Sequence, residues 1–140
     1  GEIPKHRAVA CIIGESEGEG PEGMKAISHA LRNRGTTAGV YGCTSPRVKN
    51  RLYSSKTLVQ AIKAWEESAP GRPSATIDPT NGANHWLSVD YMVQHPSWVD
   101  FCQPKAHIGD TSFITAIKDF PAGCAGINQG LDPPCSRVAV

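Results

Sequence analysis

The sequence contains no long apolar run and few aromatic residues. Its longest uninterrupted apolar stretch, residues 8–13, has six members, and aromatic residues make up 6% of the chain. A membrane-crossing helix needs about 20 apolar residues, so we expect no membrane insertion. The chain has no initiator methionine and no charged segment followed by an apolar one, so we expect that a signal peptide is absent or already removed.

Charge is scarce as well. Charged residues make up 19% of the chain against 39% hydrophobic ones, and the net charge is +1. This composition is too apolar for a disordered chain and lacks the heptads of a coiled coil. A chain of 140 residues has the size of one domain. We therefore expect a single domain over residues 1–140, in which residues 121–140 form an irregular tail rich in Gly, Pro and Cys.

Motifs for metal ions and nucleic acids are missing too. The sequence has no H-E-x-x-H, no C-x-x-C and no EF-hand loop, so we expect neither a metal ion nor another cofactor. Residues 24–64 include eight basic residues and no acid, a pattern that can attract an anionic polymer. Only Tyr41 and Tyr53 lie among these basic residues, too few rings to stack on nucleobases, so we expect no nucleic-acid partner.

The five cysteines show no regular spacing. Cys11 lies in the apolar run and is interpreted as a small buried hydrophobic residue. The other four lie in loop-like surroundings, and one or two disulfides among them would suit an oxidising destination. Their pairing stays open, and an odd total also fits a reduced protein. These four are Cys43, Cys102, Cys124 and Cys135.

Apolar periodicity predicts three helices. The i, i+3, i+4 spacing of apolar residues predicts the first helix over residues 5–15. Pro21 suits the first position of a second helix, which ends at Gly35. A third helix begins after Ser54 or Ser55 and ends before residues 70–71, Pro-Gly. Its inward stripe includes Trp65, which we interpret as a core residue.

The second half of the chain predicts a small amount of β-structure. Residues 84–86 are expected to be extended, and residues 88–94 to form a short helix. Residues 106–108 and 112–114 flank Gly-Asp, which is typical of a small hairpin. The predicted fold is therefore mainly α, of the α+β class, with a short hairpin in its C-terminal part.

Residues 14–19, G-E-S-E-G-E, hold the best catalytic candidates. Glu15 follows the apolar helix directly, and burial of a carboxyl raises its pKa as a general acid near neutral pH requires. Glu19 lies about one turn further on and can face the same cleft. The alternative is that these acids only solvate a loop and favour the N-terminus of the next helix.

The same segment also matches G-x-S-x-G, the nucleophile elbow of serine hydrolases. Ser16 would then be the nucleophile, with an aspartate and a histidine further along the chain. That elbow requires a parallel sheet of several strands, and the sequence shows no alternation of strands and crossover helices. We therefore interpret the match as chance.

Three segments together resemble the SleB/CwlJ-type cell wall hydrolases. Residues 15–23, E-S-E-G-E-G-P-E-G, followed by a helix ending in N-R, are similar to the family's opening A-E-A-R-G-E-x-x-E-G. Residues 78–83, D-P-T-N-G-A, followed by His85 and Trp86, resemble its D-P-T-G-G-A and aromatic cluster. Residues 108–113, I-G-D-T-S-F, resemble its closing I-G-N-H-x-F. The segments keep the family's order.

The resemblance implies a small lysozyme-like fold that cleaves the glycan strands of peptidoglycan, including spore cortex. It implies that Glu15 is the general acid/base, with Glu19 and Glu22 matching later acids of the motif. This chain departs from the family pattern at three motif positions, where Arg, Gly and His are expected: Glu17, Asn81 and Thr111. These departures concern contacts with the substrate more than the chemistry.

The resemblance favours a lytic transglycosylase, in which one glutamate serves as acid and base and leaves 1,6-anhydro-muramyl products. One alternative is a muramidase-type hydrolase, in which Glu19 or an aspartate joins Glu15. The carboxyl separation would be about 5–5.5 Å for a nucleophile and about 6.5–9.5 Å for a base that activates water. A further alternative is a non-catalytic glycan-binding module.

Several residues are candidates for binding the glycan. Trp86 and Tyr91 would stack on sugar faces, although Trp86 is equally interpreted as a core residue, and Trp98 is expected in the core. The polar candidates are Asn84, His85, Asp110 and Thr111. We expect a monomer that binds peptidoglycan strands and acts on the bacterial cell wall as a secreted, periplasmic or phage-delivered protein, such as an endolysin.

Overall fold

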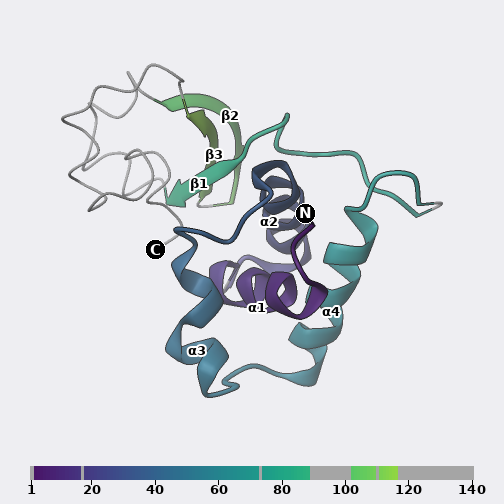
Figure 1. The fold of residues 1–140 in the computed structure, drawn as a ribbon, viewed down its shortest axis with the longest axis vertical. Helices are drawn as coiled ribbons and strands as arrows, with labels where there is room; N and C mark the ends of the chain where they lie inside the picture. Colours follow the sequence, from purple (N-terminus) through teal and green to yellow (C-terminus); the bar gives the residue numbers. More distant parts are fainter. Residues whose placement is uncertain (1, 17, 73, 89–101, 110, 117–140) are drawn as a thin grey trace.

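The computed structural model describes residues 2–16, 18–72, 74–88, 102–109 and 111–116 (Figure 1). Its helices come first in the chain and its strands last. In chain order the elements are α1 (Lys5–Glu15), α2 (Gly20–Arg34), the 3₁₀ helix η1 (Tyr41–Thr44), α3 (Pro46–Lys49), α4 (Ser55–Glu67), β1 (His85–Ser88), β2 (Cys102–Ile108) and β3 (Thr111–Ala116). This is the mainly helical fold with a late β-element that the sequence predicted.

Helix α1 forms the centre of the helical part. It contacts α2, α4 and η1, and Figure 1 shows it enclosed between them. Its buried residues are more numerous than a single amphipathic face would supply: Ala8, Val9, Cys11, Ile12 and Ile13. The predicted bounds, residues 5–15, are confirmed. The helix ends with its last residue, Glu15, just beyond the two buried isoleucines, and this places a carboxyl group at the edge of the core.

The two other predicted helices are also confirmed. Pro21 lies in the first turn of α2, where its missing N–H costs nothing. The helix ends at Gly35, whose φ of 75° is left-handed and whose N–H donates to the Leu31 carbonyl. Ser54 caps the N-terminus of α4: its side-chain oxygen accepts a hydrogen bond from the Thr57 N–H at 3.1 Å.

The short helices η1 and α3 were not predicted. Each has four residues, which is too short to show an apolar period. Both lie between α2 and α4 in sequence, and both contact α1. The route of this segment is therefore decided by packing against α1 and not by a local pattern.

A disulfide joins Cys11 of α1 to Cys43 of η1. Cys11 is buried, as expected, but the interpretation that it stays outside the disulfides is wrong. The two helices meet closely because each has a glycine at the crossing. A Cβ on Gly14 would lie 1.8 Å from the carbonyl oxygen of Gly42, so neither backbone leaves space for a side chain there. The structure does not describe the side chains of the other three cysteines, which are Cys102, Cys124 and Cys135.

The described strands form one antiparallel sheet with the order β1-β3-β2. The predicted hairpin is confirmed: β2 and β3 pair antiparallel, with Ile108 opposite Thr111. Of the extended piece expected at residues 84–86, residues 85 and 86 belong to strand β1, which continues to Ser88. Because Ser88 belongs to that strand, the predicted helix over residues 88–94 does not begin there, and its remainder lies outside the described residues.

The sheet joins the helices through two aromatic side chains. Trp86 of β1 and Phe113 of β3 are cross-strand partners, and each is 1% exposed. Strand β1 and strand β2 both contact α2, so this pair belongs to the same core as the helices. The expected tail, residues 121–140, lies outside the description.

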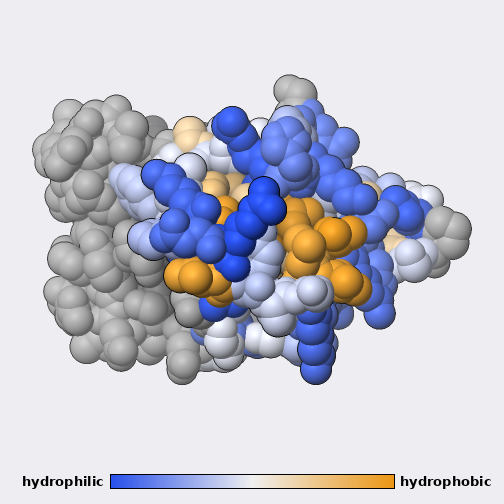
Figure 2. All heavy atoms as spheres, turned by 90° about the horizontal axis from the view of Figure 1, so that it is seen from below, coloured by the Kyte–Doolittle hydropathy of each residue, from blue (hydrophilic) through white to orange (hydrophobic). Residues whose placement is uncertain are grey.

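The exposed surface around α3 and α4 is mostly hydrophilic with apolar patches, as Figure 2 shows from below. Exposed apolar residues of this part of the chain include Leu52 and Val59, each 63% exposed. Four of the basic residues from the acid-free stretch are exposed here: Lys49, Arg51, Lys56 and Lys63. Within the described ranges, no helix combines the length and the apolar character needed to cross a bilayer.

The D-P-T-N-G-A segment forms a turn that attaches β1 to the end of α2. The Asp78 carboxylate accepts hydrogen bonds from Thr80 N–H at 2.8 Å, from Gly82 N–H at 3.0 Å and from the Asn33 side chain at 2.9 Å. Burial alone would raise the pKa of Asp78, but these hydrogen bonds together lower it. Asn81 has a φ of 56°, in the left-handed region, which explains why the resembled family has Gly where this chain has Asn.

We predict that Asp78→Ala lowers the free energy of unfolding by about 1–3 kcal/mol, because several donors lose a charged acceptor. Urea unfolding at pH 7 measures the change. The neighbouring Ile77→Ala is the control, since Ile77 is 89% exposed and should change stability by less than about 0.5 kcal/mol. An Asp78→Ala protein as stable as the wild type would show that this turn does not hold the two elements together.

Candidate functional site

Glu15 is a part-buried acid at the C-terminal end of α1. One of its carboxyl oxygens, Oε1, accepts a hydrogen bond from the Gly42 N–H at 3.2 Å. Burial raises the pKa of Glu15 from 4.5 to about 8, against the opposing effects of the Gly42 N–H and the Arg34 charge. At neutral pH the carboxyl therefore carries a proton, which is the effect of burial that the sequence predicted for this residue.

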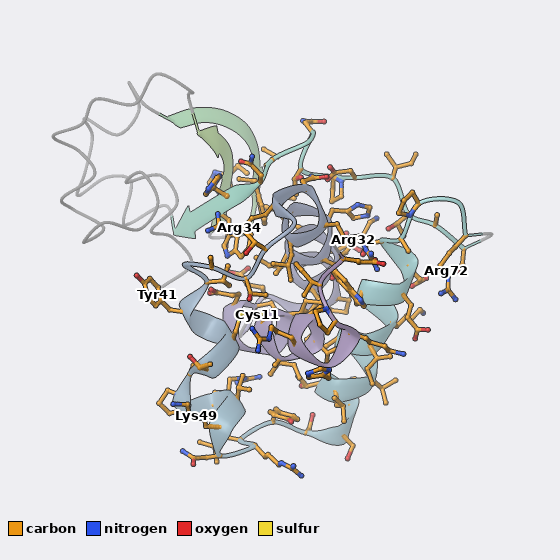
Figure 3. The ribbon with its side chains drawn as sticks, in the orientation of Figure 1. Cys11, Arg32, Arg34, Tyr41, Lys49 and Arg72 are labelled. Carbon is orange, nitrogen blue, oxygen red and sulfur yellow. A yellow bond between two sulfur atoms is a disulfide. The ribbon has the colours of Figure 1, made fainter. Side chains whose placement is uncertain are left out.

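Arg34, the last residue of α2, is the cation that acts on Glu15. Its guanidinium donates to the carbonyl oxygen of Asn84 at 3.4 Å and to that of Ala38. It therefore connects the segment leading into η1 with the start of β1. Figure 3 shows Arg34 on the side of the molecule where β1 and Tyr41 lie. The positive charge favours the carboxylate that Glu15 would become after it gives up its proton.

Asn84 and His85 lie together beside Arg34. The Nδ1 atom of His85 is 2.5 Å from the side-chain oxygen of Asn84, so Nδ1 carries the hydrogen and donates it. His85 is 8% exposed, and burial, followed by the charge of Arg34, lowers its pKa to about 3. The imidazole is therefore neutral over the whole physiological range. It can accept or donate a hydrogen bond, but it does not act as a cation.

Glu19 lies at the start of α2, where the β-hairpin meets the helix. Its Oε1 accepts from the Thr111 hydroxyl at 3.5 Å. A Cβ on Gly109 would lie 2.3 Å from Oε2, so the carboxylate rests on the hairpin turn. The structure thus brings together two residues that were predicted separately, Glu19 and Thr111, and connects the acid motif to the closing I-G-D-T-S-F motif.

Of the other residues singled out in the sequence, two tryptophans are buried and three residues lie outside the part of the chain that the structure describes. Trp86 is 1% exposed and lies in the core, which is one of its two predicted interpretations and leaves neither ring face open for a sugar. Trp65 is a core residue as predicted, with the Arg32 guanidinium 3.6 Å above its ring. Tyr91, Trp98 and Asp110 lie outside the described residues.

Ser16 is placed where a nucleophile has no access to substrate. It is 1% exposed, and its hydroxyl donates to the Ile12 carbonyl oxygen. Residues 8–13 form helix and not the strand that a nucleophile elbow needs. Among the described residues, no three His, Cys, Asp or Glu side chains are grouped as a metal site.

Sequence reasoning missed two groups that contact or act on Glu15. Arg34 is the arginine of the N-R pair that ends the opening motif, and that position was a usable signal. Gly42 had no such signal, because a glycine in a short loop between helices is usually a turn residue. Its backbone N–H reaches Glu15 only because η1 folds back onto α1.

Comparison with known proteins identifies the fold. No family model and no curated protein matches the chain. Among solved structures, the chain is similar to the catalytic domain of the Bacillus cereus SleB protein, with 21% identity and a TM-score of 0.51 over 82% of this chain and 93% of that one. It is also similar to the catalytic domain of the germination-specific lytic transglycosylase SleB from Bacillus anthracis. Here the identity is 19% and the TM-score 0.50, over 79% of this chain and 93% of that one. The chain therefore has the fold of the SleB catalytic domains.

The raised pKa of Glu15 predicts a pH-dependent stability difference between the wild type and Glu15→Gln. A carboxyl that binds its proton more tightly when folded stabilises the protein below pH 4.5, and that stabilisation is lost as the pH rises to about 8. Glutamine has no proton to lose and keeps an oxygen for the Gly42 N–H. The variant should therefore match the wild type near pH 4 and exceed it near pH 9 by about 1–3 kcal/mol.

Urea unfolding at several pH values between 4 and 9 tests this expectation. The control is Glu22→Gln, which removes an exposed acid from the first turn of α2. It should not produce a stability gap that widens over this range. Parallel stability curves for the wild type and Glu15→Gln would contradict the burial of the Glu15 carboxyl.

Proposed function

We propose that this protein cleaves the glycan strands of peptidoglycan as a lytic transglycosylase, with Glu15 as its general acid and base. The observation that carries the proposal is a carboxyl that burial keeps protonated at neutral pH, that accepts a backbone N–H, and on which the charge of Arg34 acts. The SleB catalytic-domain fold supports it, since one of the two similar structures is a lytic transglycosylase.

The reaction needs no group besides Glu15 to move protons. The Glu15 carboxyl protonates the glycosidic oxygen as the C1–O bond breaks and C1 gains oxocarbenium character. The Glu15 carboxylate then takes the proton of the C6 hydroxyl of the same sugar while that oxygen bonds to C1. A 1,6-anhydro ring forms, no water is consumed, and Glu15 is protonated again for the next cycle.

The surroundings of Glu15 suit both halves of this cycle. Burial disfavours the carboxylate, so the carboxyl still carries its proton at neutral pH and has one to give to the glycosidic oxygen. After proton transfer, the Gly42 N–H and the Arg34 charge stabilise the Glu15 carboxylate that results. An acid that must act again as a base needs its two protonation states close in energy at the working pH.

The contacts of Glu19 favour transglycosylation over hydrolysis. Its carboxylate accepts from Thr111 and rests on the Gly109 turn, so it has a role in joining the hairpin to α2. We infer that it supports the site and does not serve as a second catalytic acid. A muramidase in which Glu19 activates water, and a glycan-binding module without turnover, are the alternative outcomes of the test.

The substrate is expected to lie against Glu15 and the polar residues beside it. Asn84, His85 and Thr111 are the described candidates for contacts with hydroxyl or N-acetyl groups, and Tyr91 and Asp110 stay predictions. The exposed basic residues of α3 and α4 would attract the anionic wall polymer over long range. We propose a single-domain monomer that acts on the bacterial cell wall, outside the cytoplasm.

We predict that Glu15→Gln lowers glycan cleavage by about 10²–10⁴-fold, the usual contribution of a positioned acid/base. Purified peptidoglycan is digested by wild type, Glu15→Gln and Ser16→Ala, and the fragments are analysed by mass spectrometry. Anhydro-ended fragments from the wild type and Ser16→Ala, but not from Glu15→Gln, are the expected result. Reducing ends in place of anhydro ends would indicate hydrolysis and a second carboxylate.

Loss of cleavage in Ser16→Ala with full cleavage by Glu15→Gln would overturn the assignment in favour of Ser16. Intact glycan in all three digests, with binding retained in a pull-down on the same peptidoglycan, would leave only the binding module.

The rate of cleavage should also fall on the alkaline side as Glu15 loses its proton. Because burial raises the pKa of Glu15 to about 8, the alkaline limb of the profile should have its midpoint near that pH and not near the ordinary 4.5. Initial rates from pH 4 to 10 on a soluble glycan fragment measure it. A rate that already falls between pH 4 and 6 would mean that the acid in use is not a buried one.

A further inference from the structure

We propose that the Cys11–Cys43 disulfide and Gly42 position the Glu15 carboxyl by holding η1 against the end of α1. The inference rests on the proposed function and adds a covalent dependence to the same site. Cys11 lies four residues before Glu15, one helical turn away on α1. Cys43 directly follows Gly42, whose N–H donates to the Glu15 Oε1. The disulfide and the hydrogen bond therefore join the same two helices, one turn apart on α1 and at consecutive residues on η1.

The backbone of η1 is itself one wall of the Glu15 site. A Cβ on Gly42 would lie 2.7 Å from the Glu15 Cδ and 2.8 Å from the carbonyl carbon of Gly14. A Cβ on Gly14 would strike the Gly42 carbonyl oxygen. Because the Gly14 and Gly42 contacts are between backbones, they cannot be relieved by turning a side chain. The carboxyl thus occupies a space whose size is set by how closely η1 approaches α1.

Movement of η1 away from α1 would change Glu15 in two opposite ways. The Gly42 hydrogen bond lowers the pKa of Glu15, so its loss would raise that pKa. Burial raises the pKa, so the entry of water would lower it. Burial is the larger effect, so the pKa should fall toward 4.5. Among the described residues, the charged group acting on Glu15 is Arg34 of α2, which η1 does not carry.

The disulfide can be opened by an external dithiol such as dithiothreitol. Its two thiols are oxidised to a cyclic disulfide, and Cys11 and Cys43 each gain one hydrogen atom. The disulfide is retained outside the cell, where Glu15 would keep its raised pKa. In a reducing compartment the disulfide would open and the pKa of Glu15 would fall.

The experiment follows the Glu15 carboxyl directly in the whole chain. Protein with ¹³C-labelled glutamate carboxyls is titrated by NMR, and the Glu15 signal is identified by its absence from Glu15→Gln. Three samples are compared: oxidised, dithiothreitol-treated, and Cys11→Ala/Cys43→Ala. Alkylation and mass spectrometry confirm which cysteines are reduced. The pKa of Glu15 should fall by about one unit or more without the disulfide, and the alkaline limb of cleavage should move with it.

If circular dichroism shows that the disulfide-free protein has lost its helices, two glycine substitutions test the proposal with the disulfide intact. Gly42→Ala places a methyl group against the Glu15 carboxyl and should change its titration. Gly71→Ala is the matched control, since Gly71 has a φ of 82° and nothing within 4 Å of its added Cβ. Both substitutions should lower stability, but only Gly42→Ala should move Glu15.

An unchanged Glu15 titration in folded, disulfide-free protein overturns the proposal, as does equal titration in the two glycine variants. The titration needs no substrate. Its result is therefore separate from whether Glu15→Gln abolishes glycan cleavage, which tests the proposed function.

Discussion

The close approach of η1 to α1 is the contact on which the candidate site depends. Two glycines, Gly14 and Gly42, bring the backbones together, and a disulfide between Cys11 and Cys43, close to these glycines in sequence, holds them. The approach does two things to Glu15: it covers the carboxyl from water, and it supplies the Gly42 N–H as a donor. A side chain at either glycine would separate the helices and open the space that makes this acid unusual.

The central position of α1 is the second requirement. A helix that ends at the surface of a bundle would leave its last carboxyl in water, with an ordinary pKa. Here α1 is surrounded by α2, α4 and η1, and its buried isoleucines lead directly up to Glu15. The same core packing that stabilises the fold therefore desolvates the acid. This desolvation costs stability above pH 4.5, because the unfolded chain releases the Glu15 proton there while the folded chain still holds it, up to a pH of about 8.

The C-terminal end of α2 organises the other side of the site. Asn33 donates to Asp78 and to the Ala83 carbonyl, and Arg34 donates to the Asn84 carbonyl. Two consecutive residues of one helix thus fix where β1 begins. The N-R and D-P-T-N-G-A motifs, which lie far apart in the sequence, are two halves of one connection. Their role is largely to place Arg34 near Glu15 and to hold Asn84 and His85 beside it.

Local sequence determined the three longer helices, the hairpin and the identity of the buried acid. Apolar period, Pro21, Gly35 and the Ser54 cap act within a few residues, so they can be recognised without knowing what the helix packs against. Glu15 was recognisable because an acid directly after a buried helical stripe has to end near the core. The resemblance to a family predicted a small lysozyme-like fold, and the structural comparison shows the fold of a SleB catalytic domain.

Only the tertiary structure decided the partners of that acid. The four-residue helices η1 and α3 have no period, and the Cys11–Cys43 bond spans 32 residues that the local pattern does not relate. The sequence was compatible with Trp86 as a core residue or as a residue that stacks on a sugar. In the structure it pairs with Phe113 and is buried, so it is a core residue. Burial and backbone approach depend on segments distant in sequence. For that reason the sequence could name Glu15 but could not show Gly42 donating to it.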